Sequence, residues 1–304
     1  MSSQVVIKEQ KPAGYSRMAT AIEQLAGKIN TEPSGLYDQS VTVIAGDLTV
    51  TNDDLDIEFD IPFDDDAEVN EAEINIFNLT DSTISTVSDN AAVSISAGYG
   101  NDKGVIFSGY VRKKKTYWED VDKITTIYAL DNNGKKEQTV NLSFGAGTKA
   151  STILRKLAEL IGLPIAEFAP RREHTYKDKV TVDGGLTESL RKYAQICGVS
   201  AYICKSKLYI CNLASTYDVI YLSADTGLLN VTEFEETNTA EEYTDVVTGL
   251  NIEMLLNHRV QTGSVISITS KNANGEYWVR EGSHTYDGDT FKTKVKAISL
   301  SCIK

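Results

Sequence analysis

The feature that most constrains this fold is a two-residue hydrophobic period between residues 41 and 131. Within 55–61, for example, apolar residues alternate with polar or acidic ones, as in a strand with one buried face. Two further alternating runs flank the Gly- and Asn-rich segment 98–104, which predicts a β-hairpin. Several short strands separated by turn signals favour a small barrel or sandwich. We therefore expect residues 41–137 to form a first barrel-like β domain.

The pattern between residues 138 and 213 mixes helical and strand periods. Apolar residues recur at helical spacing after Thr148, which we expect to cap a helix, and Gly162 stands where that helix would stop. A second helix is expected over 186–197, followed by a short hairpin. These elements together predict a small α/β module.

Strand-like runs return after residue 217, with glycines at the turn positions between them. We expect residues 214–304 to form a second barrel-like β domain. Residues 1–40 carry a helical pattern over 18–29 and are expected to form an N-terminal arm. The chain of 304 residues is therefore predicted to be mainly β with a small α/β module, as two barrel-like β domains flanking a helix-containing insert.

Composition excludes several classes of function. The hydrophobic fraction of 41% and the charged fraction of 24% are ordinary for a folded, soluble protein. A net charge of -13 argues against a general phosphate-binding surface, because nucleic-acid binding depends on clustered Lys and Arg. No apolar run approaches the length of a membrane span, and residues 1–12 lack the apolar region of a secretory signal. We expect neither a membrane nor a specific nucleic acid as a partner.

The cysteines indicate free thiols rather than disulfides or a metal site. Cys197, Cys204 and Cys211 recur every seven residues, and Cys302 stands far from them. This spacing matches neither a zinc-binding pair nor a dense disulfide framework. Because free Cys behaves as a small hydrophobe, we expect buried thiols, which fits a reducing compartment.

Two segments resemble ligand sites but lack the required order of residues. The stretch 145–151 superficially resembles a phosphate loop, yet Thr148 and Ala150 interrupt the consecutive Gly-Lys-Ser/Thr that such a loop needs, so a helix start is favoured. An acidic tract could offer oxygen ligands to calcium, but the ligand order of an EF-hand is absent and a solvated loop is favoured. The tract comprises Asp53, Asp54, Asp56, Asp60, Asp64, Asp65, Asp66 and Glu68.

The histidines give no catalytic or metal-binding motif. His174 falls in the predicted α/β module, whereas His258 and His284 fall in the predicted second β domain, and no closely spaced pair links them. His284 follows Gly282 and Ser283 in what we expect to be a turn. No Gly-x-Ser-x-Gly elbow is present, and no pair of carboxylates can be singled out for acid and base roles. We assign no catalytic, cofactor-binding or metal-binding residue, expect no cofactor, and predict that the protein is not an enzyme.

Two basic clusters stand out from the acidic background. One is the run 112–115, Arg-Lys-Lys-Lys, expected at a strand end; the other is Arg171 and Arg172 with Lys177 and Lys179 nearby. Either cluster could dock an acidic surface of a partner, and either could equally be a plain solvated face. Trp118 and Trp278 lie in or beside strand patterns, which favours packing in the core or at its rim over an exposed stacking platform.

Two stretches of the sequence resemble the baseplate hub proteins of contractile phage tails and of related tail-like particles. The first runs from Ala72 through Asn78-Leu79 to Ala97-Gly98-Tyr99-Gly100, and then to a Gly-containing strand over 106–111. The second runs over 255–266 and 274–284, and is similar to the closing loop, hairpin and Gly-x-His pattern of that family. The resemblance covers most of residues 41–304, and the order of the short motifs makes it specific.

The resemblance implies a structural subunit that forms a homotrimer with six similar barrels. Such a ring would adapt the hexameric tail tube to the trimeric central spike and would contact other baseplate proteins. It would assemble in the bacterial cytoplasm and leave in a virion tail or a released tail-like particle (a tailocin). Two other roles stay open: a peripheral carbohydrate- or receptor-binding β protein, and a six-fold distal-tail or tube-like protein. A hydrolase fused into the hub is a third reading, but no spare segment is long enough for a catalytic domain.

Overall fold

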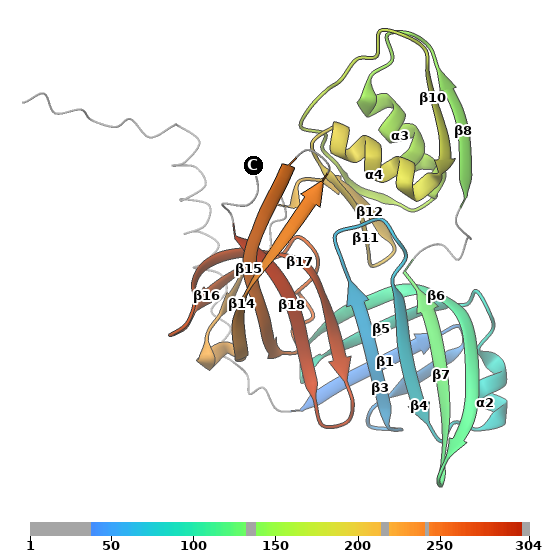
Figure 1. Ribbon diagram of the computed structural model, residues 1–304. Coiled ribbons are helices and arrows are strands. Elements are labelled where there is room, and N and C mark those ends of the chain that lie inside the picture. Colours follow the sequence, from blue (N-terminus) through green and yellow to red (C-terminus); the bar gives the residue numbers. More distant parts are fainter. Residues whose placement is uncertain (1–37, 132–137, 214–218, 241–242, 300–304) are drawn as a thin grey trace, which may run out of the picture. The chain divides into compact units, whose positions relative to one another are not determined.

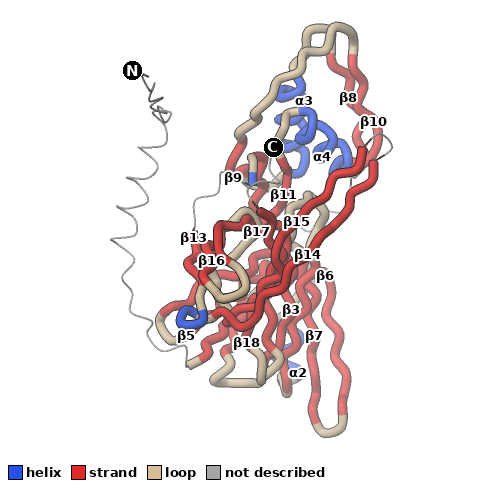
Figure 2. The backbone as a smooth tube through the Cα atoms, turned by 60° about the vertical axis from the view of Figure 1, so that its left-hand side comes forward, coloured by secondary structure: helices blue, strands red, loops and turns tan. Residues whose placement is uncertain are grey.

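The computed structural model describes residues 38–131, 138–213, 219–240 and 243–299 (Figure 1). The arm predicted over residues 1–40 lies almost wholly outside these ranges, as does the helix expected over 18–29. The described chain is mainly strand, and its two long helices lie together in one region (Figure 2). The prediction of a mainly β fold with a small helical part is confirmed. None of the helices in the described ranges is long and apolar enough to cross a membrane.

The first β region, residues 39–130, contains seven strands and one short helix. In space the strands follow the order β3-β4-β7-β6-β5-β1-β2, and every neighbouring pair is antiparallel. The elements are β1 (Gln39–Ala45), β2 (Leu48–Thr51), β3 (Ile57–Phe63), β4 (Glu71–Phe77), α2 (Asp81–Thr86), β5 (Ala92–Tyr99), β6 (Asp102–Glu119) and β7 (Asp122–Leu130).

Alternation places one side of each of these strands in a common core. In β3 the residues Ile57, Phe59 and Ile61 are buried, and the residues between them are half-buried or exposed. Strands from both ends of the spatial order contribute to the same cluster of buried side chains, including Val50 from β2 and Ile61 from β3. The sheet must curve around that cluster, which gives the region its barrel-like character.

The helical module, residues 139–211, packs two helices against short strands around a separate core. Its elements are β8 (Thr139–Phe144), α3 (Ala150–Ile161), β9 (Ile165–Phe168), β10 (Val180–Gly185), α4 (Leu186–Ile196), β11 (Ser200–Cys204) and β12 (Lys207–Cys211). Gly162 ends α3 in the left-handed conformation with φ 76°, as predicted. Thr148 was expected as the cap, but Lys149 holds that position, because the Thr148 hydroxyl donates to the Gly145 carbonyl instead (2.7 Å).

The second β region, residues 219–299, has the spatial order β14-β15-β18-β17-β16-β13. All neighbouring pairs are antiparallel except β13 with β16, which are parallel. The elements are β13 (Val219–Leu222), η2 (Ala224–Thr226), β14 (Leu228–Ala240), β15 (Tyr243–Leu255), β16 (Val265–Thr269), β17 (Asn274–Tyr286) and β18 (Phe291–Ser299). Its buried side chains form a third core, which includes Leu250, Ile266 and Val295.

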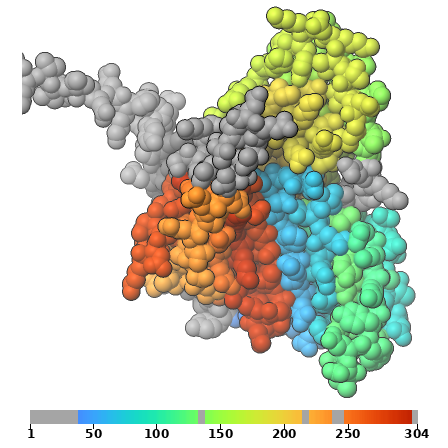
Figure 3. Space-filling view, in the orientation of Figure 1, coloured from blue at the N-terminus to red at the C-terminus, as the bar shows by residue number. Residues whose placement is uncertain are grey.

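Strand β17 joins the two β regions into one 13-stranded sheet. Its first part, residues 274–278, pairs with β16, and its last part, residues 282–286, pairs with β3 on the same edge. The red surface of the second region therefore borders the blue surface of the first directly (Figure 3). The turn expected around His284 is wrong, because Gly282, Ser283 and His284 lie within this strand and gain two strand neighbours that are distant in sequence.

The two β regions repeat one arrangement of strands. In the first region the order is β3-β4-β7-β6-β5, and in the second it is β14-β15-β18-β17-β16, with two hairpins and one further strand in the same places. The repeat extends to a bulge, because Arg112 interrupts the pairing of β6 with β7 and Arg280 interrupts that of β17 with β18. Beside the first bulge, the Val111 N–H donates to the Ala91 carbonyl (2.9 Å) and the Val111 carbonyl accepts from the Asn90 N–H (2.8 Å). Beside the second bulge, Val279 makes the same two bonds with Ser264 and Gly263 (2.9 Å each).

Candidate assembly surfaces

The three histidines do not converge. His284 is 1% exposed, its Nδ1 lies 2.9 Å from the Thr293 hydroxyl, and burial lowers its pKa to about 3, so it is a neutral core residue at ordinary pH. His258 is half-buried beside Asp102 (3.9 Å), and burial lowers its pKa as well. His174 packs its ring on Tyr176 with centroids 4.6 Å apart. Among the residues that the structure describes, no three His, Cys, Asp or Glu side chains are grouped to hold a metal.

The helix start in segment 145–151 is filled by a carboxylate of the same chain. Glu173 accepts hydrogen bonds from the Ser151 hydroxyl (2.6 Å) and the Ser151 backbone N–H (3.2 Å). These bonds lower the pKa of Glu173, so the group is an anion at the helix N-terminus. A phosphate at this place would have to displace Glu173. The preference for a helix start over a phosphate loop is consistent with this geometry.

The cysteines in the described part of the chain are buried, as predicted: Cys197, Cys204 and Cys211. The Cys204 thiol donates to the side-chain oxygen of Gln261 (3.6 Å), and burial raises its pKa to about 11. Such a thiol is a packing residue rather than a nucleophile. Cys302 lies outside the described residues.

The acidic tract is not one solvated loop, which corrects the expectation from the sequence. Asp53, Asp54 and Asp56 are exposed in the turn before β3, and Asp60 lies within β3. The rest of the tract belongs to the segment 64–70, between β3 and β4, and is drawn into tertiary contacts. The sequence could not distinguish the exposed turn before β3 from the segment 64–70, because each is a run of acidic residues near a strand end.

The segment 64–70 connects the first β region to both other parts of the chain. The Asp64 carbonyl accepts from the Thr262 hydroxyl (2.8 Å), and the Asp65 carboxylate pairs with Arg280 (3.1 Å) in the second β region. The Asp66 carbonyl accepts from the backbone N–H of Ile203 (3.4 Å) in the helical module. Ala67 is buried within the core of that module. The segment therefore acts as a structural junction.

A buried carboxyl group lies at this junction. The backbone N–H and the side-chain amide of Asn70 donate to the two carboxylate oxygens of Asp131 (3.0 and 3.3 Å). Burial raises the pKa of Asp131 to about 7, and burial together with Asp66 raises the pKa of Asp64 to about 6. Raised carboxyl pKa values can mark acid–base catalysts, but here Asp131 is enclosed and held by Asn70.

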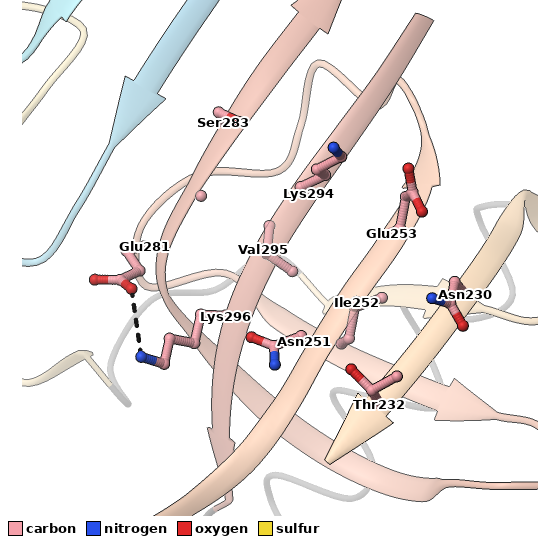
Figure 4. Close-up of a pocket in the computed structure, with 11 residues that line it drawn as sticks. Asn230, Thr232, Asn251, Ile252, Glu253, Glu281, Ser283, Lys294, Val295 and Lys296 are labelled. Atoms are coloured by element: carbon pink, nitrogen blue, oxygen red, sulfur yellow. Dashed lines mark ion pairs between the residues drawn. The ribbon is translucent and has the colours of Figure 1, made fainter. Parts of the chain in front are cut away.

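A polar groove of about 440 Å³ crosses β14, β15, β18 and β17 (Figure 4). Lys296 pairs with Glu236 and Glu281, the latter at 3.6 Å, and Lys292 beside the groove pairs with Glu253 (2.9 Å). Opposite charges thus neutralise one another along the groove. This pattern is typical of a structural sheet face rather than of a site poised for proton transfer.

The run 112–115 was expected at a strand end but lies inside β6, which continues to Glu119. Arg112 pairs with Glu71 (2.5 Å), and the Lys114 ammonium donates to the carbonyls of Ile84 (2.6 Å) and Val87. Lys113 lies over the ring of Tyr128 (4.3 Å) and Lys115 over that of Tyr117 (5.6 Å). None of the three lysines has a carboxylate partner among the described residues.

The second basic cluster is exposed: Arg171, Arg172, Lys177 and Lys179.

The two tryptophans differ sharply. Trp278 is 5% exposed, which confirms core packing, whereas Trp118 is 69% exposed near the end of the β6–β7 hairpin, so the expectation of core or rim packing is wrong for it. Val121, at the hairpin turn, is 84% exposed. Both residues extend past the core of the first β region, because β6 and β7 are longer than the strands beside them.

Among the repeated strands, two edges are open in the described part of the chain; strands β2 and β13, outside the repeat, also pair on one side only there. Strand β14 pairs with β15 alone, and the end of β6, residues 112–119, pairs with β7 alone. The open edge of β14 carries Glu233, Glu235 and Glu236, which the sequence reasoning missed. The signal was present as an acidic strand pattern, but without the pairing of the sheet nothing marked that strand as an edge.

Comparison with known proteins places these surfaces in a family. The family model described as baseplate hub gp41 matches residues 39–287. No curated protein matches the chain. Among solved structures, a tail protein from Neisseria meningitidis MC58 is similar with a TM-score of 0.62 at 11% identity, covering 88% of this chain and 98% of that one.

Two further structures share the fold. The 43 kDa tail protein of prophage MuSo2 from Shewanella oneidensis has a TM-score of 0.64 at 8% identity, covering 88% of this chain and all (100%) of that one. The E. coli c3393 protein, a component of the type VI secretion system, has a TM-score of 0.56 at 10% identity, covering 81% and 74%. At these identities the structures support the fold alone. Because the family model spans most of the described residues, this chain belongs to the baseplate hub gp41 family of phage tail proteins.

Proposed function

We propose that the protein is a structural hub subunit that forms a homotrimeric ring and adapts a six-fold tail tube to a three-fold central spike. The observation that carries this proposal is the repeated strand arrangement, β3-β4-β7-β6-β5 and β14-β15-β18-β17-β16. Two similar β regions in each chain let three copies present six similar units. Such a ring matches six-fold symmetry on one face and three-fold symmetry on the other, and ring contacts of this kind close without leftover edges.

The proposal includes a division of the chain into domains, a set of partners and a place of assembly. The three separate cores support a division into a first β domain over 41–137, an α/β module over 138–213 and a second β domain over 214–304. Tube, spike and other baseplate proteins are the expected partners. Assembly in the bacterial cytoplasm, followed by release in a tail or tail-like particle, fits the free thiols of Cys197 and Cys204.

Electron cryomicroscopy of the assembled particle tests the symmetry directly. We expect density for this chain with three-fold symmetry between tube and spike, and native mass spectrometry of the purified chain should show trimers. Six copies in a ring would instead support the distal-tail or tube-like role.

We also propose that the chain has no enzymatic activity. Two groups with strongly shifted pKa values, His284 and Asp131, are enclosed and hydrogen-bonded in the described structure. A cell-wall zymogram with the purified protein should show no lysis. A clear zone that disappears when one named carboxylate is substituted would overturn this reading.

A further inference from the structure

We propose that neighbouring copies of this chain join edge to edge, with the end of β6 (residues 112–119) pairing with β14 (residues 231–236) of the next copy. The inference rests on the proposed ring and names its interface. The starting point is the pairing of β17 with β3 inside one chain. Because the two β regions repeat the same strand order, this internal joint has an equivalent between chains.

The repeat defines which strands correspond. The bulges at Arg112 and Arg280 align β6 with β17, so that Lys114 corresponds to Gly282, Thr116 to His284 and Trp118 to Tyr286. The neighbouring hairpins then align β3 with β14. The internal joint therefore pairs the β6-equivalent of the second region with the β14-equivalent of the first region. The same joint between chains needs an open β6 end and an open β14.

Both edges are open, as the proposal requires. Residues 282–286 of β17 are covered by β3, whereas the corresponding residues 114–118 of β6 have no strand on that side among the described residues. Strand β3 is flanked by β4 and β17, whereas β14 has only β15 beside it among the described strands. Unpaired strand edges expose rows of N–H and C=O groups that favour strand addition.

The corresponding register makes specific pairs. Gly282 faces Phe63 in the internal joint, His284 faces Ile61 and Tyr286 faces Phe59. Translated through the repeat, Lys114 faces Glu235 of the next copy, Thr116 faces Glu233, and Trp118 faces Val231. Because side chains alternate across a strand, this register also fixes which face each pair occupies.

Charge and apolar surface are complementary in that register. The β14 edge carries Glu233 and Glu235, both exposed and without an ion-pair partner among the described residues. On the β6 edge, Lys114 shares their face and donates to the carbonyls of Ile84 and Val87 in the single chain, while Lys113 and Lys115 add positive charge on the opposite face. Opposite charges on facing edges favour this pairing and oppose the pairing of an edge with its own kind. Trp118, 69% exposed in the single chain, would be covered by Val231.

The two edges also define the type of contact between copies. The basic edge of one copy meets the acidic edge of the next, so the contact is heterologous, and it gives a ring rather than a filament when the rotation between copies closes, as the proposed trimer requires. The occupant of the β6 edge is therefore a second copy of this chain rather than another tail protein.

Cysteine crosslinking tests the register. In a Cys302→Ser background, whose other cysteines are buried, Thr116→Cys combined with Glu233→Cys should give disulfide-linked dimers and trimers on mild oxidation. The matched control combines Thr116→Cys with Thr232→Cys, which moves one thiol to the opposite face of β14. We expect at least about a tenfold lower yield of crosslinked product from the control, because its two thiols point to opposite faces of the sheet.

Charge reversal tests the same interface independently. Glu233→Lys with Glu235→Lys should raise the concentration for half-dissociation of the trimer at least about tenfold, because the lysine at 235 would face Lys114 and the lysine at 233 would lie diagonal to it. Asp178→Lys with Asp183→Lys, exposed on the helical module, is the matched control and should leave assembly unchanged. Trimers that resist the reversal, or that crosslink equally well through the control pair, would overturn the interface while leaving the ring intact. A chain that stays monomeric and uncrosslinked would overturn both.

Discussion

Residues 282–286 of β17 and residues 114–118 of β6 hold equivalent places in the two β regions, yet their surroundings differ. His284 is 1% exposed between β18 and β3, whereas Trp118, two residues beyond the position equivalent to His284, is 69% exposed. The strands are similar and the neighbours are not. The comparison teaches that exposure at the end of β6 reflects a missing neighbour rather than a different local structure.

The largest difference should come from adding a side chain at the covered position. A Cβ at Gly282 would lie 2.4 Å from the Lys294 carbonyl oxygen and 2.7 Å from the Phe63 ring. Gly282→Val should therefore lower the free energy of unfolding by about 3 kcal/mol. Lys115→Val, on the open end of β6, should cost less than about 0.5 kcal/mol. Urea denaturation of both variants makes the comparison, and equal losses would contradict it.

The second prediction concerns the stability of the chain and its dependence on the protonation of Asp131 at the junction. Because burial raises the pKa of Asp131 to about 7 from its usual 3.8, its stabilising contribution is complete at low pH and is lost as pH rises toward 7. Asp131→Asn keeps the shape without the charge. Relative to the parent, it should gain about 2.5 kcal/mol of stability between pH 5 and pH 8.

The quantity to measure is the difference in the free energy of unfolding between Asp131→Asn and the parent. His284 titrates in the opposite direction, because its pKa falls to about 3 on folding, and its contribution is shared by both proteins and cancels. Urea midpoints at the two pH values provide the measurement. A difference that is independent of pH would show that Asp131 ionises as freely in the folded chain as in the unfolded one.

The next-largest difference in stability is expected between substitutions of the equivalent aromatic residues Tyr286 and Trp118. Tyr286 packs against Phe59 and Phe291, with ring centroids 5.9 and 5.1 Å apart, whereas Trp118 is mostly exposed. Tyr286→Ala should destabilise the chain by about 2 kcal/mol, and Trp118→Ala by less than about 0.5 kcal/mol when the protein is dilute enough to be monomeric. If Trp118→Ala is the more costly change in dilute protein, the hairpin end is packed within the single chain.

The smallest effect concerns the two bulge arginines. Arg280 pairs with Asp65 across the joint between the β regions, and both side chains are largely covered, whereas Arg112 pairs with Glu71 at the surface. Arg280→Ala should cost about 1.5 kcal/mol and Arg112→Ala less than about 0.5 kcal/mol, because exposed ion pairs contribute little. Thermal unfolding at low and high salt provides the measurement, and equal losses would argue against the junction.

Much of the fold could be read from local patterns, because alternation and helical spacing are properties of short segments. The strands over 55–61 and 106–111, the stop of α3 at Gly162 and the buried thiols all follow from neighbouring residues. The candidate surfaces could not be predicted in the same way. Whether an acidic segment such as 64–70 is solvated depends on partners far away, such as Thr262 and Arg280.

The sequence by itself determined a mainly β chain with a helical module and a resemblance to baseplate hubs, because hydrophobic period and motif order are local. Only the tertiary structure decided that β17 joins the two β regions, that the strand order repeats, and that a basic edge and an acidic edge stay open. Strand pairing links residues that are distant in sequence, and no short-range pattern specifies which edge remains without a neighbour.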